Sequence, residues 1–261
     1  MKIPRERPLR VGCVKYLNAR PLIQGWEGKV VLDHPSTLCA QLARGELDVA
    51  LVSSFEFLRN PIYRIVDGVS ISSDGAVYSV VVAYAGDTPL PEIELDPASE
   101  TSVVLLRYLL AERGQEFRAV EMARDSLSPI KRGRARLLIG DHAIRFRQKF
   151  ADDYRYWDLG EEWKGLTKLP FVYALWLVRP EVKHPKAIAD RLRLLRDVNL
   201  DNIESVIEAK HEFSADFCLD YYREYLRFNF GENEKNGLRA FSKLCQKHGL
   251  LPKRELVLDV I

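Results

Sequence analysis

Residues 11–22 read Val-Gly-Cys-Val-Lys-Tyr-Leu-Asn-Ala-Arg-Pro-Leu, a short apolar run that breaks into a polar turn. The turn carries Asn18 and Arg20, and Pro21 suits the first position of a following helix. In α/β proteins, small anions are commonly bound where a strand ends in a polar turn at a helix N-terminus. An ordinary strand–helix connection would give the same pattern, so residues farther along the chain must decide between the two interpretations.

Alternating strand and helix patterns surround this stretch. Residues 9–14 and 30–32 predict strands, and a helix begins at Pro35, with Ser36 as its expected N-cap. Residues 48–52 form a continuous apolar run, which is typical of a parallel strand covered on both faces. This β-α-β-α-β order predicts a doubly wound α/β architecture.

Two long apolar strand patterns, at residues 77–84 and 169–178, predict paired crossings between two lobes. A turn-rich segment at residues 86–91 follows the first of them. We therefore expect one discontinuous lobe from residues 1–85 and 179–261 and a second lobe from residues 86–178. A cleft between such lobes is a common place for a small-molecule site.

The last third of the chain is helical in pattern. Residues 185–209, 215–227 and 233–248 predict three helices, the second of them capped by Ser214. We expect these helices to pack on the first lobe.

Composition limits the classes of function. The 261 residues are 47% hydrophobic, and a net charge of +2 is too balanced to indicate a nucleic-acid surface. Residues 1–8 carry charges and two prolines where a signal peptide needs an apolar core, and no later run is long enough to span a bilayer. We therefore expect a cytoplasmic protein with no membrane partner. The four cysteines and five histidines show no metal-ligand spacing, so the sequence predicts no metal site.

Seven short motifs lie along the first two thirds of the chain: YLNARPL at residues 16–22, GELDVAL at 45–51, ISSDGAVYSV at 71–80, SETS at 99–102, IGDHAI at 139–144, DLG at 158–160 and LPFVYALW at 169–176. Together, and in this order, they resemble the chorismate dehydratases of the futalosine route to menaquinone. The resemblance implies a two-lobed α/β fold of the type II periplasmic-binding-protein class. It also implies removal of water from chorismate, without a cofactor, to give 3-[(1-carboxyvinyl)oxy]benzoate.

The same resemblance implies that Asn18 and Ser79 fall at positions expected to act in catalysis. The residues expected to bind substrate follow from their own placement: Arg20 in the polar turn, Ser99, Thr101 and Ser102 at a helix start, and Asp141 after a strand end. Chorismate is a dianion, and hydroxyls and free backbone N–H groups at a helix start suit one of its carboxylates. Simpler roles stay open: Asn18 could close a turn, Ser79 could bond within a strand, and Asp141 could cap a helix.

No side-chain base stands out among these residues, so the substrate's own carboxylate is a candidate acceptor for the ring proton. Two other functions remain as alternatives. A solute-binding protein of a transporter shares the fold class, and 1,4-dihydroxy-6-naphthoate synthase is a related enzyme. The latter family opens with a Ser-Pro-Cys-Pro-Asn-Asp-like turn, whereas this chain has Lys-Tyr-Leu-Asn-Ala-Arg-Pro at residues 15–21. The sequence assigns no oligomeric state.

Overall fold

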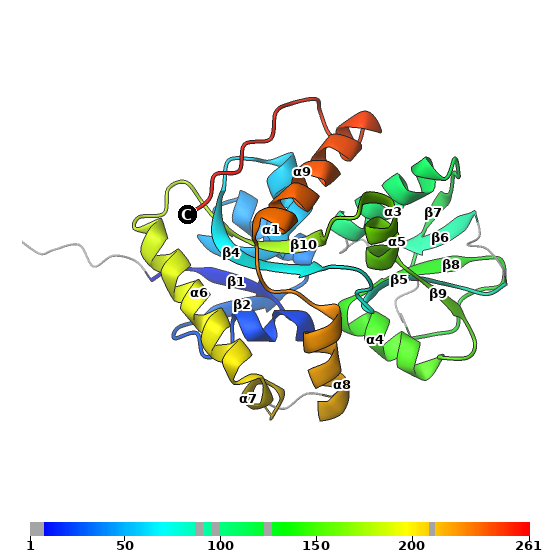
Figure 1. Ribbon diagram of the computed structural model, residues 1–261, viewed down its shortest axis with the longest axis horizontal. Coiled ribbons are helices and arrows are strands. Elements are labelled where there is room, and N and C mark those ends of the chain that lie inside the picture. Colours follow the sequence, from blue (N-terminus) through cyan, green and yellow to red (C-terminus); the bar gives the residue numbers. More distant parts are fainter. Residues whose placement is uncertain (1–7, 87–90, 96–99, 123–126, 209–211) are drawn as a thin grey trace, which may run out of the picture.

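The computed structural model describes residues 8–86, 91–95, 100–122, 127–208 and 212–261. Two five-stranded mixed sheets lie side by side, each covered by helices (Figure 1). The first sheet has the strand order β2 (Val30–Asp33), β1 (Val11–Val14), β3 (Val49–Ser53), β10 (Phe171–Val178) and β4 (Arg64–Ser73). The second has the order β7 (Arg118–Glu121), β6 (Glu92–Leu95), β8 (Ala135–Ile139), β5 (Val80–Tyr84) and β9 (Arg155–Asp158). The predicted two-lobed α/β fold is confirmed.

The first lobe follows the predicted alternation closely. β1 is parallel to β2 and β3, and every residue of β3 is buried. The polar turn forms a 3₁₀ helix, η1 (Leu17–Leu22), and α1 (Pro35–Ala43) and α2 (Ser54–Arg59) follow β2 and β3. The expected cap of α1 was wrong by two residues. The helix is capped by His34 with Pro35 in its first turn, because the ring of a proline suits a position whose N–H has no helical partner.

The second lobe packs three helices around its sheet. These are α3 (Glu100–Glu112), α4 (Gly140–Lys149) and α5 (Leu159–Thr167), and two of them start directly at strand ends: α4 after β8 and α5 after β9. Strand ends and helix starts therefore meet at the face of this lobe that turns toward the first lobe.

The crossing between the lobes lies earlier in the chain than expected. The predicted strand over residues 77–84 begins only at Val80, because residues 74–79 form a turn in which Tyr78 has a left-handed backbone with φ of 66°. β4 belongs to the first sheet and β5 to the second, so the chain crosses between residues 73 and 80. It returns before β10, which lies antiparallel between β3 and β4 in the first sheet. The two sheets thus divide the chain at different places from the boundaries expected at residues 85 and 178.

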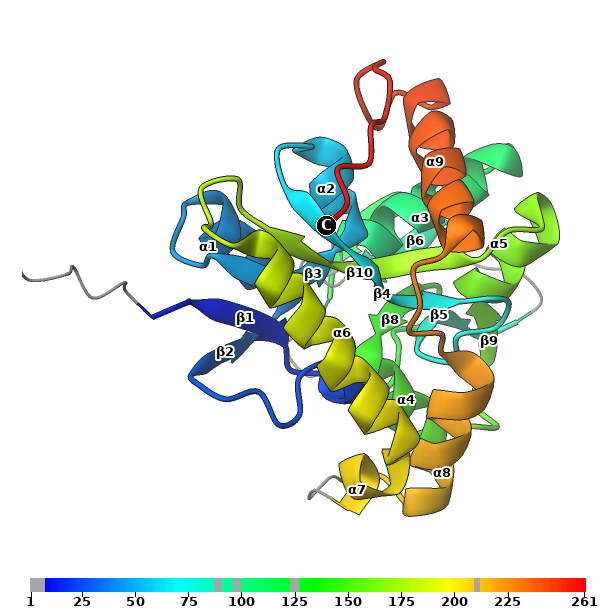
Figure 2. The same cartoon turned by 60° about the vertical axis from the view of Figure 1, so that its left-hand side comes forward.

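The C-terminal helices contact both lobes. α6 (Pro185–Asp201) runs across the first lobe and is followed by α7 (Ile203–Glu208), as Figure 2 shows. α8 (Ala215–Asp220) is capped by Ser214, as predicted: the Ser214 hydroxyl accepts a hydrogen bond from the Phe217 N–H. α8 continues into one turn of π-helix, η2 (Tyr221–Tyr225). α9 (Glu232–Lys247) packs on β10 and reaches the second lobe, where Lys247 pairs with Glu112 of α3 at 2.9 Å.

Within the described ranges, none of the helices has both the length and the apolar character needed to cross a bilayer. The four cysteines are buried free thiols, as expected for small apolar core residues.

Candidate active site

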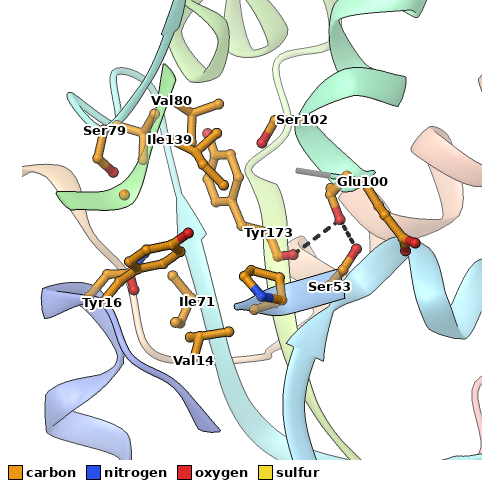
Figure 3. Close-up of a pocket in the computed structure, with 16 residues that line it drawn as sticks. Val14, Tyr16, Ser53, Ile71, Ser79, Val80, Glu100, Ser102, Ile139 and Tyr173 are labelled. Atoms are coloured by element: carbon orange, nitrogen blue, oxygen red, sulfur yellow. Dashed lines mark hydrogen bonds between the residues drawn. The ribbon is translucent and has the colours of Figure 1, made fainter. Parts of the chain in front are cut away.

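A cavity of about 590 Å³, its open mouth included, lies between the two lobes. Its wall is mostly apolar and carries a few polar groups, the usual make-up of a small-molecule site. Both lobes and the first crossing contribute to it, and the polar residues that line it are Tyr16, Asn18, Ser53, Ser79, Glu100, Thr101, Ser102 and Tyr173. Figure 3 shows Ser79 and Ser53 on opposite sides of this space.

Asn18 stands on η1 with its amide at the cavity wall. Its Oδ1 atom is buried and has no hydrogen-bond partner among the described residues. A buried acceptor without a partner is costly, because it has lost its water without replacement. An acceptor of this kind beside a cavity suits a donor group on a ligand.

Ser79 lies fully buried at the end of the first crossing, and its backbone is fixed on both sides. Its N–H donates to the carbonyl of Val77 at 2.8 Å, and its carbonyl accepts from the N–H of Gly140 at 2.8 Å. The left-handed turn before it is held by Asp158, whose carboxylate accepts from the N–H of Tyr78 at 2.8 Å. The same carboxylate also caps α5, so one buried side chain joins the crossing to a helix start.

Thr101 and Ser102 lie in the first turn of α3 on the opposite wall. The Thr101 hydroxyl donates to the carbonyl of Tyr173 at 3.4 Å and is bonded to the hydroxyl of Ser53, as the dashed lines in Figure 3 mark. Thr101 is therefore engaged within the protein, whereas Ser102 lines the cavity from a buried position. Ser99, the other expected contact of this segment, lies outside the described residues.

Arg20 and Asp141 line a neighbouring crevice rather than this cavity. Asp141 does not cap α4: its Oδ1 accepts from the N–H of Leu17 at 2.8 Å and so joins the second lobe to the start of η1. Burial raises the pKa of Asp141, and the bond from Leu17 lowers it in part. The structure thus brings together Asn18, Ser79, Thr101 and Ser102 but leaves the other two expected residues apart.

Three polar residues of this region were missed in the sequence. Ser53 ends the apolar strand β3, and a polar residue at the carboxyl end of a parallel strand is a signal that could have indicated it. Tyr173 sits within a continuous apolar strand, which gave no hint of a role at the cavity. Asp158 is separated by 80 residues from the turn it holds, so no local pattern connects them.

Cys39, Glu56 and Glu100 place their ligand atoms within 4.8 Å of one another beside the cavity. The guanidinium of Arg59 pairs with both carboxylates, at 3.3 Å from Glu100. Burial raises the pKa of the Cys39 thiol, which keeps it protonated. The cluster therefore consists of two glutamates that share one arginine, beside a neutral thiol.

Known proteins resemble this chain in sequence and in fold. A sequence family described as menaquinone biosynthesis matches residues 9–247. A chorismate dehydratase of Thermus thermophilus is 30% identical, covering 91% of this chain and 95% of that protein. A chorismate dehydratase of Campylobacter jejuni is 24% identical, covering 88% and 91%.

Among solved structures, protein AF1704 of Archaeoglobus fulgidus superposes with a TM-score of 0.70 at 19% identity, over 93% of this chain and 98% of that one. The alkanesulfonate-binding protein SsuA of Xanthomonas axonopodis pv. citri gives 0.67 at 16% identity, over 97% of both chains. These two likenesses establish the periplasmic-binding-protein type of fold. Because the family match spans most of the chain and the Thermus relative is similar over nearly its whole length, this chain belongs to the menaquinone biosynthesis family.

Proposed function

We propose that this protein is a chorismate dehydratase that converts chorismate into 3-[(1-carboxyvinyl)oxy]benzoate and water, on the futalosine route to menaquinone. The observation that carries the proposal is the match to chorismate dehydratases over nearly the whole chain, joined to a cavity in which Asn18 and Ser79 present polar groups between the lobes. The reaction is a step of cofactor biosynthesis, and we place it in the cytoplasm.

The reaction requires little covalent chemistry from the protein. A proton leaves the ring carbon that bears the enolpyruvyl ether, the bond between the neighbouring carbon and its hydroxyl breaks, and the electron pairs close an aromatic ring. The departing hydroxide and the proton together make one water. Aromatisation drives the reaction, so the main contribution of the protein to catalysis is to hold the dianion in the reactive conformation.

The polar groups of the cavity suit this task. The Ser79 hydroxyl can hydrogen-bond the leaving oxygen as negative charge develops on it, and Asn18 Oδ1 can accept from the same hydroxyl group. Ser102 and the N-terminal turn of α3 offer a place for a carboxylate on the opposite wall.

For the proton acceptor we propose the substrate's own side-chain carboxylate, which then passes the proton to the departing hydroxide. Of the described residues lining the cavity, Glu100 alone carries a carboxylate, and Arg59 is paired with it. Glu100→Gln should therefore retain most of the turnover. A collapse of kcat in this variant, with binding intact, would make Glu100 the base instead.

The activity is tested by incubating the purified protein with chorismate and following the loss of its diene absorbance, with the product identified by mass. We expect catalytic loss of chorismate and a product lighter by one water. Tight binding of chorismate without consumption would instead fit the solute-binding proteins that share this fold. Ser79→Ala, prepared in parallel, serves as the control for contaminating activity.

A further inference from the structure

Tyr221 is a buried tyrosine whose hydroxyl contacts the cavity residue Ser79 from outside the described cavity lining. It is the first residue of η2 and is fully buried, and its side chain reaches from the C-terminal segment to the crossing that carries Ser79. Tyr221 is not one of the described residues that line the cavity. Any effect it has on a ligand held there must pass through its neighbours.

The neighbour that matters is Ser79, one of the two residues expected to act in catalysis. The Tyr221 hydroxyl donates to Ser79 Oγ at 2.6 Å. Asn18, the other of the two, lines the same cavity as Ser79.

The direction of this hydrogen bond decides where the Ser79 proton points. Burial raises the pKa of Tyr221, so the phenol stays protonated and remains a donor at working pH. A hydroxyl oxygen that already accepts one proton turns its own proton away from that donor. Ser79 lines the cavity, whereas Tyr221 lies outside the described lining, so the remaining direction for the Ser79 proton is toward the cavity. Accepting a hydrogen bond also makes a hydroxyl a stronger donor.

The ring of Tyr221 is held in place from one side. It stacks on Phe217 with ring centroids 5.8 Å apart and an angle of 11° between the planes. Tyr222 and Tyr225 lie against it at 6.1 and 6.5 Å. A phenol fixed in this way keeps its hydroxyl on Ser79 without losing side-chain freedom at each turnover.

We propose that Tyr221 is a positioning residue of the dehydration: it donates to Ser79 Oγ and thereby aims the Ser79 proton at the leaving hydroxyl of the substrate. The inference rests on the proposed function, and it adds a residue from the C-terminal helical segment to a site built by the two lobes. A tyrosine that merely fills space would be replaced by phenylalanine without an effect on turnover.

The test is a double-mutant cycle in kcat on chorismate with Tyr221→Phe, Ser79→Ala and the double variant. We expect Tyr221→Phe to lower kcat about tenfold, the scale of one lost hydrogen bond, with KM unchanged. In the Ser79→Ala background, Tyr221→Phe should have no further effect, because the hydroxyl through which it acts is gone. Tyr156→Phe is the matched control: it removes a tyrosine hydroxyl bonded to the Phe150 carbonyl at 2.8 Å, away from the cavity, and should leave kcat unchanged.

The outcomes distinguish a failure of the proposed function from a failure of the positioning role. If the wild-type protein does not consume chorismate, the proposed function fails and the role of Tyr221 falls with it. If the wild type is active and Tyr221→Phe has wild-type kcat, or lowers kcat equally in both backgrounds, only the positioning role is overturned.

A second measurement covers the case in which Tyr221→Phe does not fold. A 3-fluorotyrosine placed at position 221 keeps the hydroxyl and the ring, and its ¹⁹F resonance reports the hydrogen bond. We expect this resonance to shift when Ser79→Ala is introduced and to stay unchanged with Tyr156→Phe. An unchanged resonance in the Ser79→Ala protein would show that the contact is absent and would overturn the inference.

Discussion

At the scale of single residues, ligand binding in the cavity depends on a few polar atoms in apolar surroundings. Ser79 is held by its backbone and by Tyr221, and Asn18 keeps one buried acceptor without a partner among the described residues. Such groups bind strongly to a ligand that satisfies them, because little water competes in a closed cleft.

Removing either polar group should act on turnover far more than on folding. We expect Asn18→Ala and Ser79→Ala each to lower kcat on chorismate by roughly 10²- to 10³-fold, the scale for losing one preorganised hydrogen-bonding group at a reacting oxygen. Thermal unfolding followed by circular dichroism should show a cooperative transition for both variants, with a modest decrease in melting temperature for Ser79→Ala because the buried Tyr221 hydroxyl loses its acceptor. Rates near the wild-type value in both variants would remove these residues from the site.

Asp141→Asn should behave differently, because Asp141 faces the neighbouring crevice and bonds Leu17. An asparagine oxygen can still accept that bond, so we expect most of the turnover to survive. A collapse of kcat with binding intact would instead assign the proton transfer to Asp141.

The same carboxyl also predicts a pH effect on stability. Burial raises the pKa of Asp141 above its ordinary value of 3.8, so the folded state binds this proton more tightly than the unfolded state does. Its contribution to the free energy of unfolding is therefore full below pH 3.8 and is lost as pH rises through the raised pKa. Urea unfolding should show the wild type gaining stability relative to Asp141→Asn as pH falls toward 4. The opposite trend would mean that folding lowers the pKa of Asp141.

At the scale of elements, the parts of the fold that local pattern determines were predicted from the sequence. β1, β2, β3 and α1 follow from continuous apolar runs and a helix-starting proline. The break at residues 74–79 could not be predicted this way, because the left-handed turn at Tyr78 is held by Asp158 from a distant strand end. An apolar run across that break looks like one strand until the distant partner is known.

Gly140 begins α4 at a point where the two lobes touch. Its φ is 53°, and a Cβ there would lie 2.8 Å from the Tyr16 ring of the first lobe. We expect Gly140→Ala to lower the free energy of unfolding by about 1–2 kcal/mol through left-handed backbone strain. KM for chorismate should also rise, because the ring of Tyr16 lines the cavity and would be pushed aside.

Gly165→Ala is the control for this substitution. Gly165 lies inside α5 with no atom within 4 Å of an added Cβ and without a positive φ. Alanine should leave KM unchanged there and stabilise the helix by roughly 0.5–1 kcal/mol. Equal effects of the two substitutions on KM would show that the contact between Tyr16 and Gly140 does not shape the cavity.

At the scale of the whole molecule, two lobes and a C-terminal segment meet around one cleft. The resemblance of short motifs to a known family predicted Asn18 and Ser79, which lie far apart in sequence and line the same cavity. Tyr221 could not be predicted, since 142 residues separate it from Ser79 and its pattern is that of an ordinary core tyrosine. Contacts between residues far apart in the chain are therefore the part of the site that the sequence alone does not predict.

Cleft closure is the expected motion of such a molecule. The Leu17–Asp141 hydrogen bond and the close approach of the Tyr16 ring to Gly140 join the lobes in this structure, and opening of the cleft would break them. We expect the radius of gyration measured by small-angle scattering to fall when the protein is saturated with 3-[(1-carboxyvinyl)oxy]benzoate. Gly140→Ala should show a smaller decrease, and a radius that does not change in the wild type would count against closure.

Dehydration of chorismate in the cleft between the lobes, through Asn18 and Ser79, can be tested in a single assay. Chorismate is followed with the wild type, with Tyr156→Phe and with the double variant Asn18→Ala/Ser79→Ala, all under one condition, and the product is identified by mass. We expect many turnovers to 3-[(1-carboxyvinyl)oxy]benzoate by the first two proteins and almost none by the third. Chorismate left intact by the wild type, or consumed equally by all three, would refute this role of the cleft.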